Sequence, residues 1–216
     1  MLIGLYGGTF DPVHMGHINA ASAVKQHLGL DEVRLVLNAQ PAHKEVGCAP
    51  SEHRWAMLKA ACANRAGLAA DNTELRRGGR SYTIDTLRTF QQQNPNDTLC
   101  WIVGEDSFAT LPSWHRWQDM LDYCNFIVLN RPGQSAPWPP QLTALCNDHQ
   151  CPQLDPSRSG QIVKLDLPML EISSTEIRQC IAFGQCVADM IDADVDEYIR
   201  DNELYIDYST TRETPI

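Results

Sequence analysis

The chain has 216 residues, of which 27 are acidic and 17 are Lys or Arg, giving a formal net charge of −10, and 43% of its residues are hydrophobic. This length favours a single domain with a substantial core, and the apolar fraction excludes an intrinsically disordered chain. No run of about 18 apolar residues is present, which excludes a membrane-spanning helix. The excess of acids argues against a general nucleic-acid binder, which needs a basic face. The first residues lack the basic start of a signal peptide, so we expect a cytoplasmic protein.

In chain order, the predicted elements begin with a buried strand over 2–6, a helix over about 16–28 and a strand over 33–37. A helix with Ser51 as its N-cap, a strand-like piece near 73–76 and a helix over about 83–92 follow, and then apolar strands over 99–103 and 125–129. Residues 132–161 hold six of the 13 prolines. They predict an irregular surface excursion with a short helix near 141–146. Order returns at 162–165, before helices over 174–183 and 195–204.

Apolar strands that alternate with helices predict an α/β fold: a Rossmann-like, doubly wound parallel sheet with helices on both faces. We expect one domain over 1–216, with a core over 1–170 and a small C-terminal helical part over 171–207. Ligands of such sheets bind at the carboxyl ends of strands. Gly7-Gly8 and Gly104 each follow a strand, so they are expected at that edge.

The eight cysteines include no Cys-x-x-Cys pair. The nearest approach to a metal cluster is Cys146, His149 and Cys151, which lack a fourth ligand at zinc spacing. We therefore expect reduced thiols and no protein-bound metal.

The first candidate site is the segment Gly7-Gly8-Thr9-Phe10-Asp11-Pro12-Val13-His14-Met15-Gly16-His17. Glycines after a strand let backbone N–H groups approach an anion, and the following helix adds its positive N-terminal end. His14 and His17, three apart, share one face of that helix and could donate to phosphoryl oxygens. The residues alone leave three alternatives: a glycine-rich turn with incidental histidines, a metal pair without a third ligand, and a nucleoside triphosphate site without a Walker lysine.

The second candidate site is Ile172-Ser173-Ser174-Thr175-Glu176-Ile177-Arg178. Its hydroxyl residues can cap a helix whose free N–H groups face an anion, and Arg178 can fork two phosphate oxygens. Taken alone, an ordinary N-cap beside a surface arginine is the simpler interpretation. Five further polar segments follow strands or open helices: 38–44, 80–87, 103–108, 111–117 and 130–133.

The pattern Gly-Thr-Phe-Asp-Pro-x-His-x-Gly-His in the first segment resembles the signature of the nucleotidyltransferase superfamily, relatives of class I aminoacyl-tRNA synthetases. Segment 172–178 fits the second motif of that superfamily. The remaining segments resemble those of the bacterial nicotinate-nucleotide adenylyltransferases, and the resemblance runs from about Gly4 to Tyr205.

This resemblance implies transfer of the adenylyl group of ATP to nicotinate mononucleotide, giving nicotinate adenine dinucleotide and pyrophosphate in NAD biosynthesis. The attack would be direct and in line, without a covalent enzyme intermediate. Mg²⁺ would arrive with ATP, and no tightly bound organic cofactor, nucleic acid or membrane partner is expected. The alternatives are another adenylyltransferase of the superfamily, such as the pantetheine-phosphate enzyme, and a nucleotide-binding regulator without chemistry.

The site roles also follow from the resemblance. The residues expected to act in catalysis are His14, His17, Lys44 and Arg178. Those expected to bind ATP are Gly8, Thr9, Phe10, His14, His17, Gly104, Asp106, Ile172, Ser173, Ser174 and Arg178. Those expected to bind nicotinate mononucleotide are Gly7, Gly8, Thr9, Asn38, Lys44, Tyr82, Thr83, Trp114 and Arg131. Contact of His115 with substrate and the choice between monomer and homo-oligomer stay open.

The negative charge is concentrated near the C-terminus. Residues 189–207 hold eight acids and one arginine, a net charge of −7. We interpret this stretch as the solvated face of a terminal helix. The net charge of the whole chain therefore does not exclude small polyanionic substrates.

Overall fold

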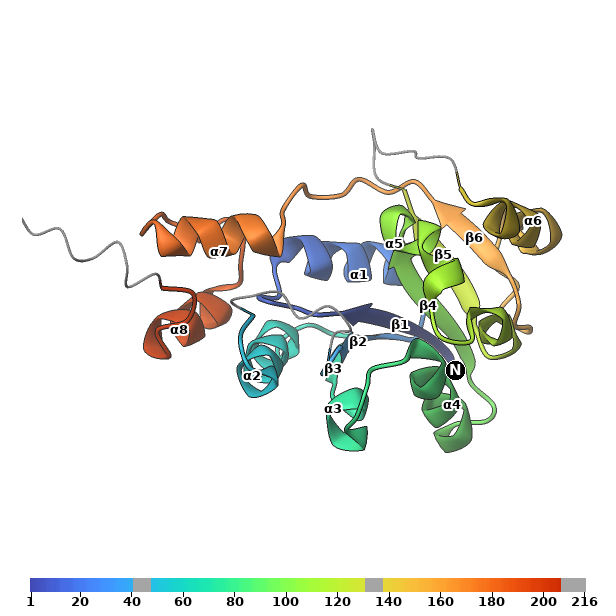
Figure 1. Cartoon of the computed structure of the whole chain (residues 1–216), viewed down its shortest axis with the longest axis horizontal. Helices are drawn as coiled ribbons and strands as arrows, with labels where there is room; N and C mark the ends of the chain where they lie inside the picture. The colour runs from blue at the N-terminus through green and yellow to red at the C-terminus, as the bar shows by residue number, and fades with distance from the viewer. Residues whose placement is uncertain (41–47, 131–137, 207–216) are drawn as a thin grey trace, which may run out of the picture.

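The computed structural model describes residues 1–40, 48–130 and 138–206. They form a six-stranded sheet in the order β3-β2-β1-β4-β5-β6, in which every neighbouring pair is parallel (Figure 1). The strands are β1 (Leu2–Gly8), β2 (Glu32–Leu37), β3 (Leu68–Asp71), β4 (Thr98–Gly104), β5 (Asn125–Leu129) and β6 (Ile162–Leu165). The strand order reverses between β1 and β4, so a crevice is expected at their carboxyl ends.

Helices cover both faces of this sheet, as expected for a doubly wound fold. One core contains residues of α1 (Met15–Leu28), α2 (Ser51–Cys62), α7 (Ser174–Ala182) and α8 (Ala193–Asp201). The other contains residues of α4 (Thr83–Gln93), α5 (Glu105–Ala109), α6 (Pro140–His149) and the 3₁₀ segments η1 (Leu111–Ser113) and η2 (Trp117–Asp122). The predicted α/β fold class is confirmed.

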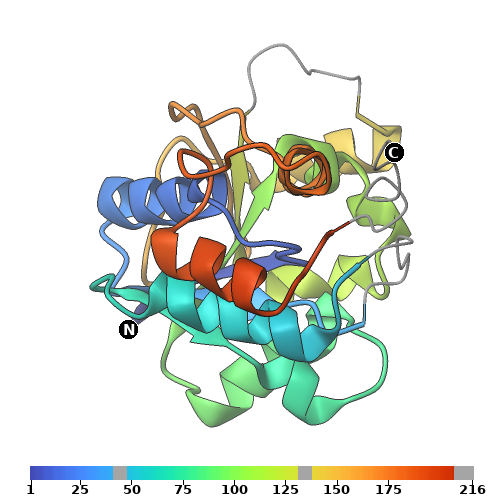
Figure 2. The same ribbon diagram turned by 90° about the vertical axis from the view of Figure 1, so that its left-hand side faces the viewer.

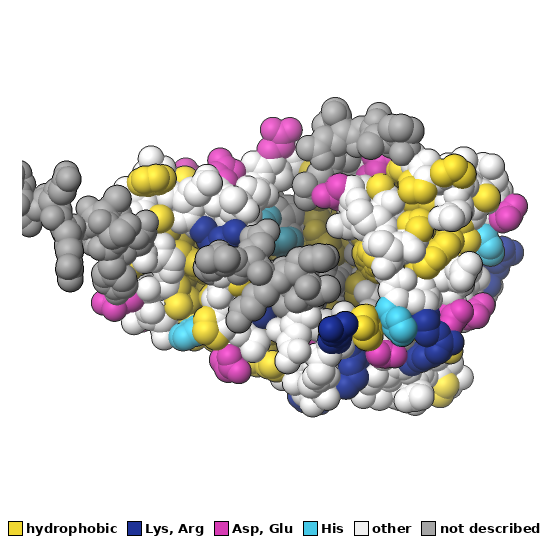
Figure 3. Space-filling model, in the orientation of Figure 1, with side chains coloured by type: hydrophobic (Ala, Val, Ile, Leu, Met, Phe, Trp, Pro, Cys, Tyr) yellow, Lys and Arg dark blue, Asp and Glu magenta, His cyan; other side chains and the backbone are white. Residues whose placement is uncertain are grey.

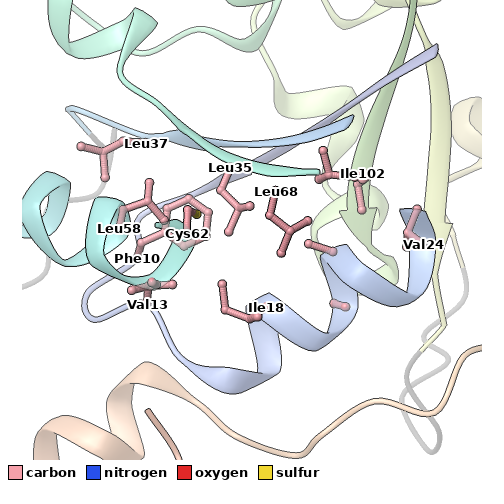
Figure 4. Close-up of a cluster of buried hydrophobic side chains, with 14 of the residues drawn as sticks. Phe10, Val13, Ile18, Val24, Leu35, Leu37, Leu58, Cys62, Leu68 and Ile102 are labelled. Atoms are coloured by element: carbon pink, nitrogen blue, oxygen red, sulfur yellow. The ribbon is translucent and has the colours of Figure 1, made fainter. Parts of the chain in front are cut away.

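The two cores arise because successive side chains of a strand point to opposite faces. In β4, Ile102 joins the first core, whereas its neighbours Trp101 and Val103 join the second. Figure 4 shows part of the first core, where Phe10 from the loop after β1 meets Leu58 of α2. Apolar side chains of the first core therefore pack against the loop that carries the first motif.

Two of the elements predicted in the first half of the chain differ in the structure. Residues 73–76 lie in a helix, α3 (Thr73–Arg77), and the strand before it is β3. Asp71 explains the change, because its Oδ1 accepts the Thr73 N–H at 2.8 Å and starts the helix there. Ser51 is the first helical residue of α2 rather than its N-cap, which is Pro50.

The short helix predicted near 141–146 is confirmed, but part of the surface excursion predicted over 132–161 is buried. Residues 140–149 form α6, which is longer than the expected short helix. Its Leu142 and Cys146 are buried in the second core. The prolines do not prevent this helix, because they lie at its start, where proline is tolerated. Burial of the apolar residues on one face of the helix stabilises it. No helix of the described residues is long and apolar enough to cross a membrane.

Candidate functional site

A cavity of about 700 Å³ opens at the carboxyl ends of β1, β2 and β4, where the sheet order reverses. The space-filling view shows the molecule hollowed near the middle of this face (Figure 3). Ten of the predicted site residues line the cavity: Gly7, Gly8, Thr9, His17, Asn38, Tyr82, Thr83, Gly104, Asp106 and Trp114. Four crossover segments therefore supply one site, as the strand pattern predicts.

The two glycines at the end of β1 are required by close packing. A Cβ atom on Gly7 would lie 2.6 Å from the Trp101 ring, and one on Gly8 would lie 2.7 Å from the Phe10 ring. Larger residues would push these aromatic rings out of place. The bare backbone of β1 is consequently what borders the cavity.

His17 lies in the first turn of α1 and borders the cavity. Its ring stacks on that of His14, with centroids 3.7 Å apart, and meets the edge of Phe10 at 5.0 Å. The His14 N–H donates to His17 Nδ1 at 3.3 Å. A neutral imidazole that accepts at Nδ1 carries its proton on Nε2, so His17 can donate a hydrogen bond from Nε2.

The His14 ring packs against the His17 ring, and His14 is not among the residues that line the cavity. It is the N-cap residue of α1 and only 7% exposed. A Cβ on Gly16 would lie 2.9 Å from His14 Nδ1, so the motif needs glycine there to admit the His14 ring. Of the two histidines, only His17 therefore borders the cavity.

The second motif lies against the outer side of the first. Ser173 is the N-cap of α7, and its Oγ accepts the Glu176 N–H at 3.1 Å. The Ser174 hydroxyl donates to the Pro12 carbonyl at 2.9 Å. Arg178 Nη1 donates to the Asp11 carbonyl at 2.8 Å. The two motifs are therefore in contact, although Ile172, Ser173, Ser174 and Arg178 do not border the cavity themselves.

The opposite wall is aromatic and polar. Tyr82 is the N-cap residue of α4, and its ring stacks on His115 with centroids 4.4 Å apart. Trp114 Nε1 donates to Thr110 Oγ1 at 3.1 Å, which fixes the indole. The first N–H groups of a helix have no partner within it, so this wall combines aromatic rings with a helix start of the kind that can bind an anion.

The end of β4 brings a carboxylate to the same cavity. Gly104 is both the last residue of β4 and the N-cap residue of α5. A Cβ on Gly104 would lie 2.6 Å from Asp106 Oδ1, so the carboxylate folds back over the glycine. Hydroxyl groups are natural donors to a carboxylate placed in this way.

Several residues that line the cavity were not predicted, among them Tyr6, Gln40, Glu74, Arg80 and Trp101. His115, whose contact stayed open, also lines it. Apolar strand residues such as Trp101 give no functional signal in the sequence, because core packing explains them equally well.

Arg54 was missed although it holds the site together. It is 2% exposed, and its Nη1 donates to the carbonyls of Thr9 and Asn38, both at 2.8 Å. Nη2 donates to Ala39 O at 3.1 Å and Nε to Ala49 O at 3.0 Å. A signal was present, because Arg54 precedes Met57 and Leu58 at the three- and four-residue spacing of a buried helix face.

Two of the predicted site residues, Lys44 and Arg131, lie outside the described residues. Within the described ranges, no group of three or more His, Cys, Asp or Glu side chains is placed to hold a metal ion. The charge available to a polyanion in those ranges comes from side chains such as Arg80 and from helix starts. A hydrogen bond to Tyr82 raises the pKa of Arg80.

The sequence of this chain is similar to that of a known family and of several named proteins. Residues 5–180 match the model of the family described as Cytidylyltransferase-like. A protein of Aeromonas salmonicida named "Probable nicotinate-nucleotide adenylyltransferase" is 41% identical over 206 residues, covering 94% of this chain and 96% of its own. A protein of the same name from Pseudomonas entomophila is 38% identical over 206 residues, covering 94% of each chain.

The fold also matches solved structures. Nicotinic acid mononucleotide adenylyltransferase of Plasmodium falciparum, complexed with NaAD, superposes with a TM-score of 0.72 at 19% identity, covering 94% of this chain and 96% of that one. The same enzyme complexed with APC gives a TM-score of 0.70 at 20% identity with the same coverage. At these identities the likeness concerns the fold.

Proposed function

This chain belongs to the cytidylyltransferase-like family and, within it, to the nicotinate-nucleotide adenylyltransferases, and from that membership we propose how its site works. The enzyme transfers the adenylyl group of ATP to nicotinate mononucleotide, giving nicotinate adenine dinucleotide and pyrophosphate. The observation that carries this function is the cavity itself: its wall is built by the glycine-histidine motif in a chain that matches named relatives over nearly its whole length.

The reaction is a direct displacement at phosphorus. An oxygen of the mononucleotide 5′-phosphate forms a bond to the α-phosphorus of ATP, and the bond from that phosphorus to the oxygen bridging to the β-phosphate breaks. Pyrophosphate leaves with the bonding electrons. Because the attacking phosphate is already an anion at neutral pH, no general base is required, and positioning and charge stabilisation supply the catalysis.

The phosphates meet at the first motif. His17 donates from Nε2 to an oxygen of the α-phosphoryl group as charge develops, and His14 holds the His17 ring in place. Lys44 and Arg178 stabilise the leaving pyrophosphate. Mg²⁺ would enter with ATP as part of the substrate rather than in a protein cage, and it would supply positive charge to the phosphates.

The two nucleosides bind on opposite sides of these phosphates. Gly104 and Asp106 hold the adenosine, with the carboxylate toward its ribose, and Ile172, Ser173 and Ser174 complete the ATP side. The mononucleotide takes the aromatic wall, with its pyridine ring against Trp114 and Tyr82 and its carboxylate at the start of α4 near Thr83. Asn38 and Arg131 complete that side. A cytoplasmic location for the enzyme is part of this proposal.

The decisive experiment measures pyrophosphate release from ATP with three acceptors in turn: nicotinate mononucleotide, its amide and phosphopantetheine. We expect the highest kcat/KM with nicotinate mononucleotide. A preference for phosphopantetheine would identify a different adenylyltransferase of the superfamily. Absence of release with all three, together with measurable ATP binding, would identify a regulator without chemistry.

A further inference from the structure

We infer that Tyr205 is a positioning residue for the phosphate side of the site, on which it acts through Asp11 and Arg178. The inference rests on the proposed function, because it concerns the groups that are proposed to meet ATP. It starts from a cluster of contacts around Asp11, a buried carboxylate within the first motif that the proposed reaction does not use.

Asp11 is 4% exposed and gathers three segments that are remote in the sequence. Its Oδ1 accepts a hydrogen bond from the Tyr205 hydroxyl at 2.7 Å and another from the Ala49 N–H at 3.1 Å. Its Oδ2 lies 3.7 Å from Arg178 Nη1. A buried carboxylate needs such donors, because an uncompensated charge in the interior is costly.

Arg178 is held to the same residue by a second contact, since its Nη1 also donates to the Asp11 backbone carbonyl at 2.8 Å. The Asp11 carboxylate therefore faces one cation and three neutral donors, which are the Tyr205 hydroxyl, the Ala49 N–H and the Cys48 thiol. When the Tyr205 hydroxyl is removed, the unmet lone pairs of Oδ1 strengthen the pull of the carboxylate on Arg178. The guanidinium is then drawn toward Asp11 and away from an incoming phosphate.

The backbone gives a second route for the same effect. Asp11 and His14 are separated by only Pro12 and Val13, both buried, so a shift of Asp11 is carried to the stacked histidines. Displacements of about 1 Å in a catalytic group cost large factors in rate. Tyr205 thus bears on both proposed phosphate contacts, although its own ring is not among the residues that border the cavity.

The turn that carries Tyr205 is built for this contact. Helix α8 lies alongside α2 (Figure 2), and after it Glu203 and Tyr205 both adopt left-handed backbone angles, with φ of 51° and 65°. Such angles are unfavourable for these residue types and persist only where the surroundings fix them. Burial, and then the charge of Asp11, raise the pKa of Tyr205, so its hydroxyl stays protonated and remains a donor.

The test compares Tyr205→Phe with Tyr198→Phe. Both variants remove one hydroxyl from the C-terminal part of the chain, but the Tyr198 hydroxyl bonds His53 Nδ1 at 3.0 Å, on the contact between α8 and α2. We expect Tyr205→Phe to lower kcat/KM for ATP by about tenfold, the usual effect of losing a hydrogen bond to a charged group. The KM for nicotinate mononucleotide at saturating ATP should stay unchanged. Tyr198→Phe should keep wild-type kinetics.

Melting temperatures of the two variants distinguish a loss of positioning from a general loss of stability. If both variants lose similar stability and only Tyr205→Phe loses kcat/KM for ATP, the inference is supported. Wild-type kinetics in Tyr205→Phe, or an equal loss for both substrates, would overturn it. Failure of the wild-type enzyme to release pyrophosphate with any acceptor would instead contradict the proposed function.

Discussion

His14 and His17 lie close together in the sequence, but their surroundings in the structure differ. The sequence places them on one face of a helix start, and the structure confirms this by stacking their rings. Only His17 borders the cavity, whereas His14 is buried under it in space left by Gly16. The resemblance implies that both histidines face the ATP phosphates, and the proposed direct contact is given to His17 because only its side chain borders the cavity.

Replacing His17 with Ala should lower kcat by about 10²–10³, because one preorganised donor to the developing charge is lost. The affinity for ATP should change little, since the contact strengthens only in the transition state. Steady-state kinetics with saturating nicotinate mononucleotide check this. His27→Ala is the matched control, as His27 is exposed at the far end of the same helix, and it should retain full activity. An unchanged kcat in the His17 variant would exclude the proposed role.

At the scale of elements, the site depends on how two loops are joined. Arg54 of α2 joins the loops after β1 and β2, because it donates to carbonyls in both. Four backbone acceptors around one guanidinium form a network that a single ammonium group cannot reproduce. Helix α2 is therefore a part of the site, although none of its residues borders the cavity.

Arg54→Lys should lower the free energy of unfolding by about 2–4 kcal/mol, because buried carbonyls lose their donors while a buried charge remains. Urea unfolding followed by far-ultraviolet circular dichroism measures the change. Arg200→Lys provides the comparison, since Arg200 is exposed and its ion pair with Asp196 lies on the surface of α8. That variant should stay within about 0.5 kcal/mol of wild type. Equal stabilities of the two variants would show that the Arg54 network is dispensable.

At the scale of the whole molecule, charge and thiols are distributed by the fold. The acidic C-terminal stretch is partly solvated, as expected, with Asp194, Glu197 and Asp201 exposed. Asp192, by contrast, pairs with Arg65 at 2.6 Å and ties the start of α8 to the segment after α2. All eight cysteines are free thiols, and burial raises the pKa of those in the cores.

These buried thiols predict alkaline destabilisation. Burial raises the pKa of Cys62 to about 11 and that of Cys100 to about 12, whereas in the unfolded chain both would titrate near 9.0. Above pH 9 the unfolded state therefore releases protons that the folded state retains, so the free energy of unfolding falls as pH rises toward 12. Below that range these groups contribute no pH dependence.

Urea midpoints between about pH 8 and pH 11 measure this slope. Cys100→Ala should make it shallower, because one such group is removed from the balance. Cys186→Ser should leave it unchanged, since Cys186 is exposed. An identical slope in wild type and Cys100→Ala would refute this explanation.

The sequence alone was sufficient to predict a doubly wound parallel sheet, the edge of the sheet at which the cavity lies and ten of the residues that line it. Apolar strands, glycines at strand ends and the two motifs are local patterns, and local patterns are read from neighbours in the chain. The strand predicted near 73–76 was wrong, and the actual strand is β3 at Leu68–Asp71. This strand is too short to show a hydrophobic period, and Asp71 starts a helix at Thr73.

Only the tertiary structure could decide which residues hold that edge in shape. Arg54 meets Thr9 and Asn38, and Tyr205 meets Asp11 across 194 positions of sequence. The helical spacing of Arg54 could indicate that it is buried, but a single sequence does not show which carbonyls it meets. The contact between Tyr205 and Asp11 gives no sequence signal at all, because the two residues are remote in the chain. The sequence motifs contain the candidate reactive residues, whereas the side chains that hold those residues in position meet only after folding.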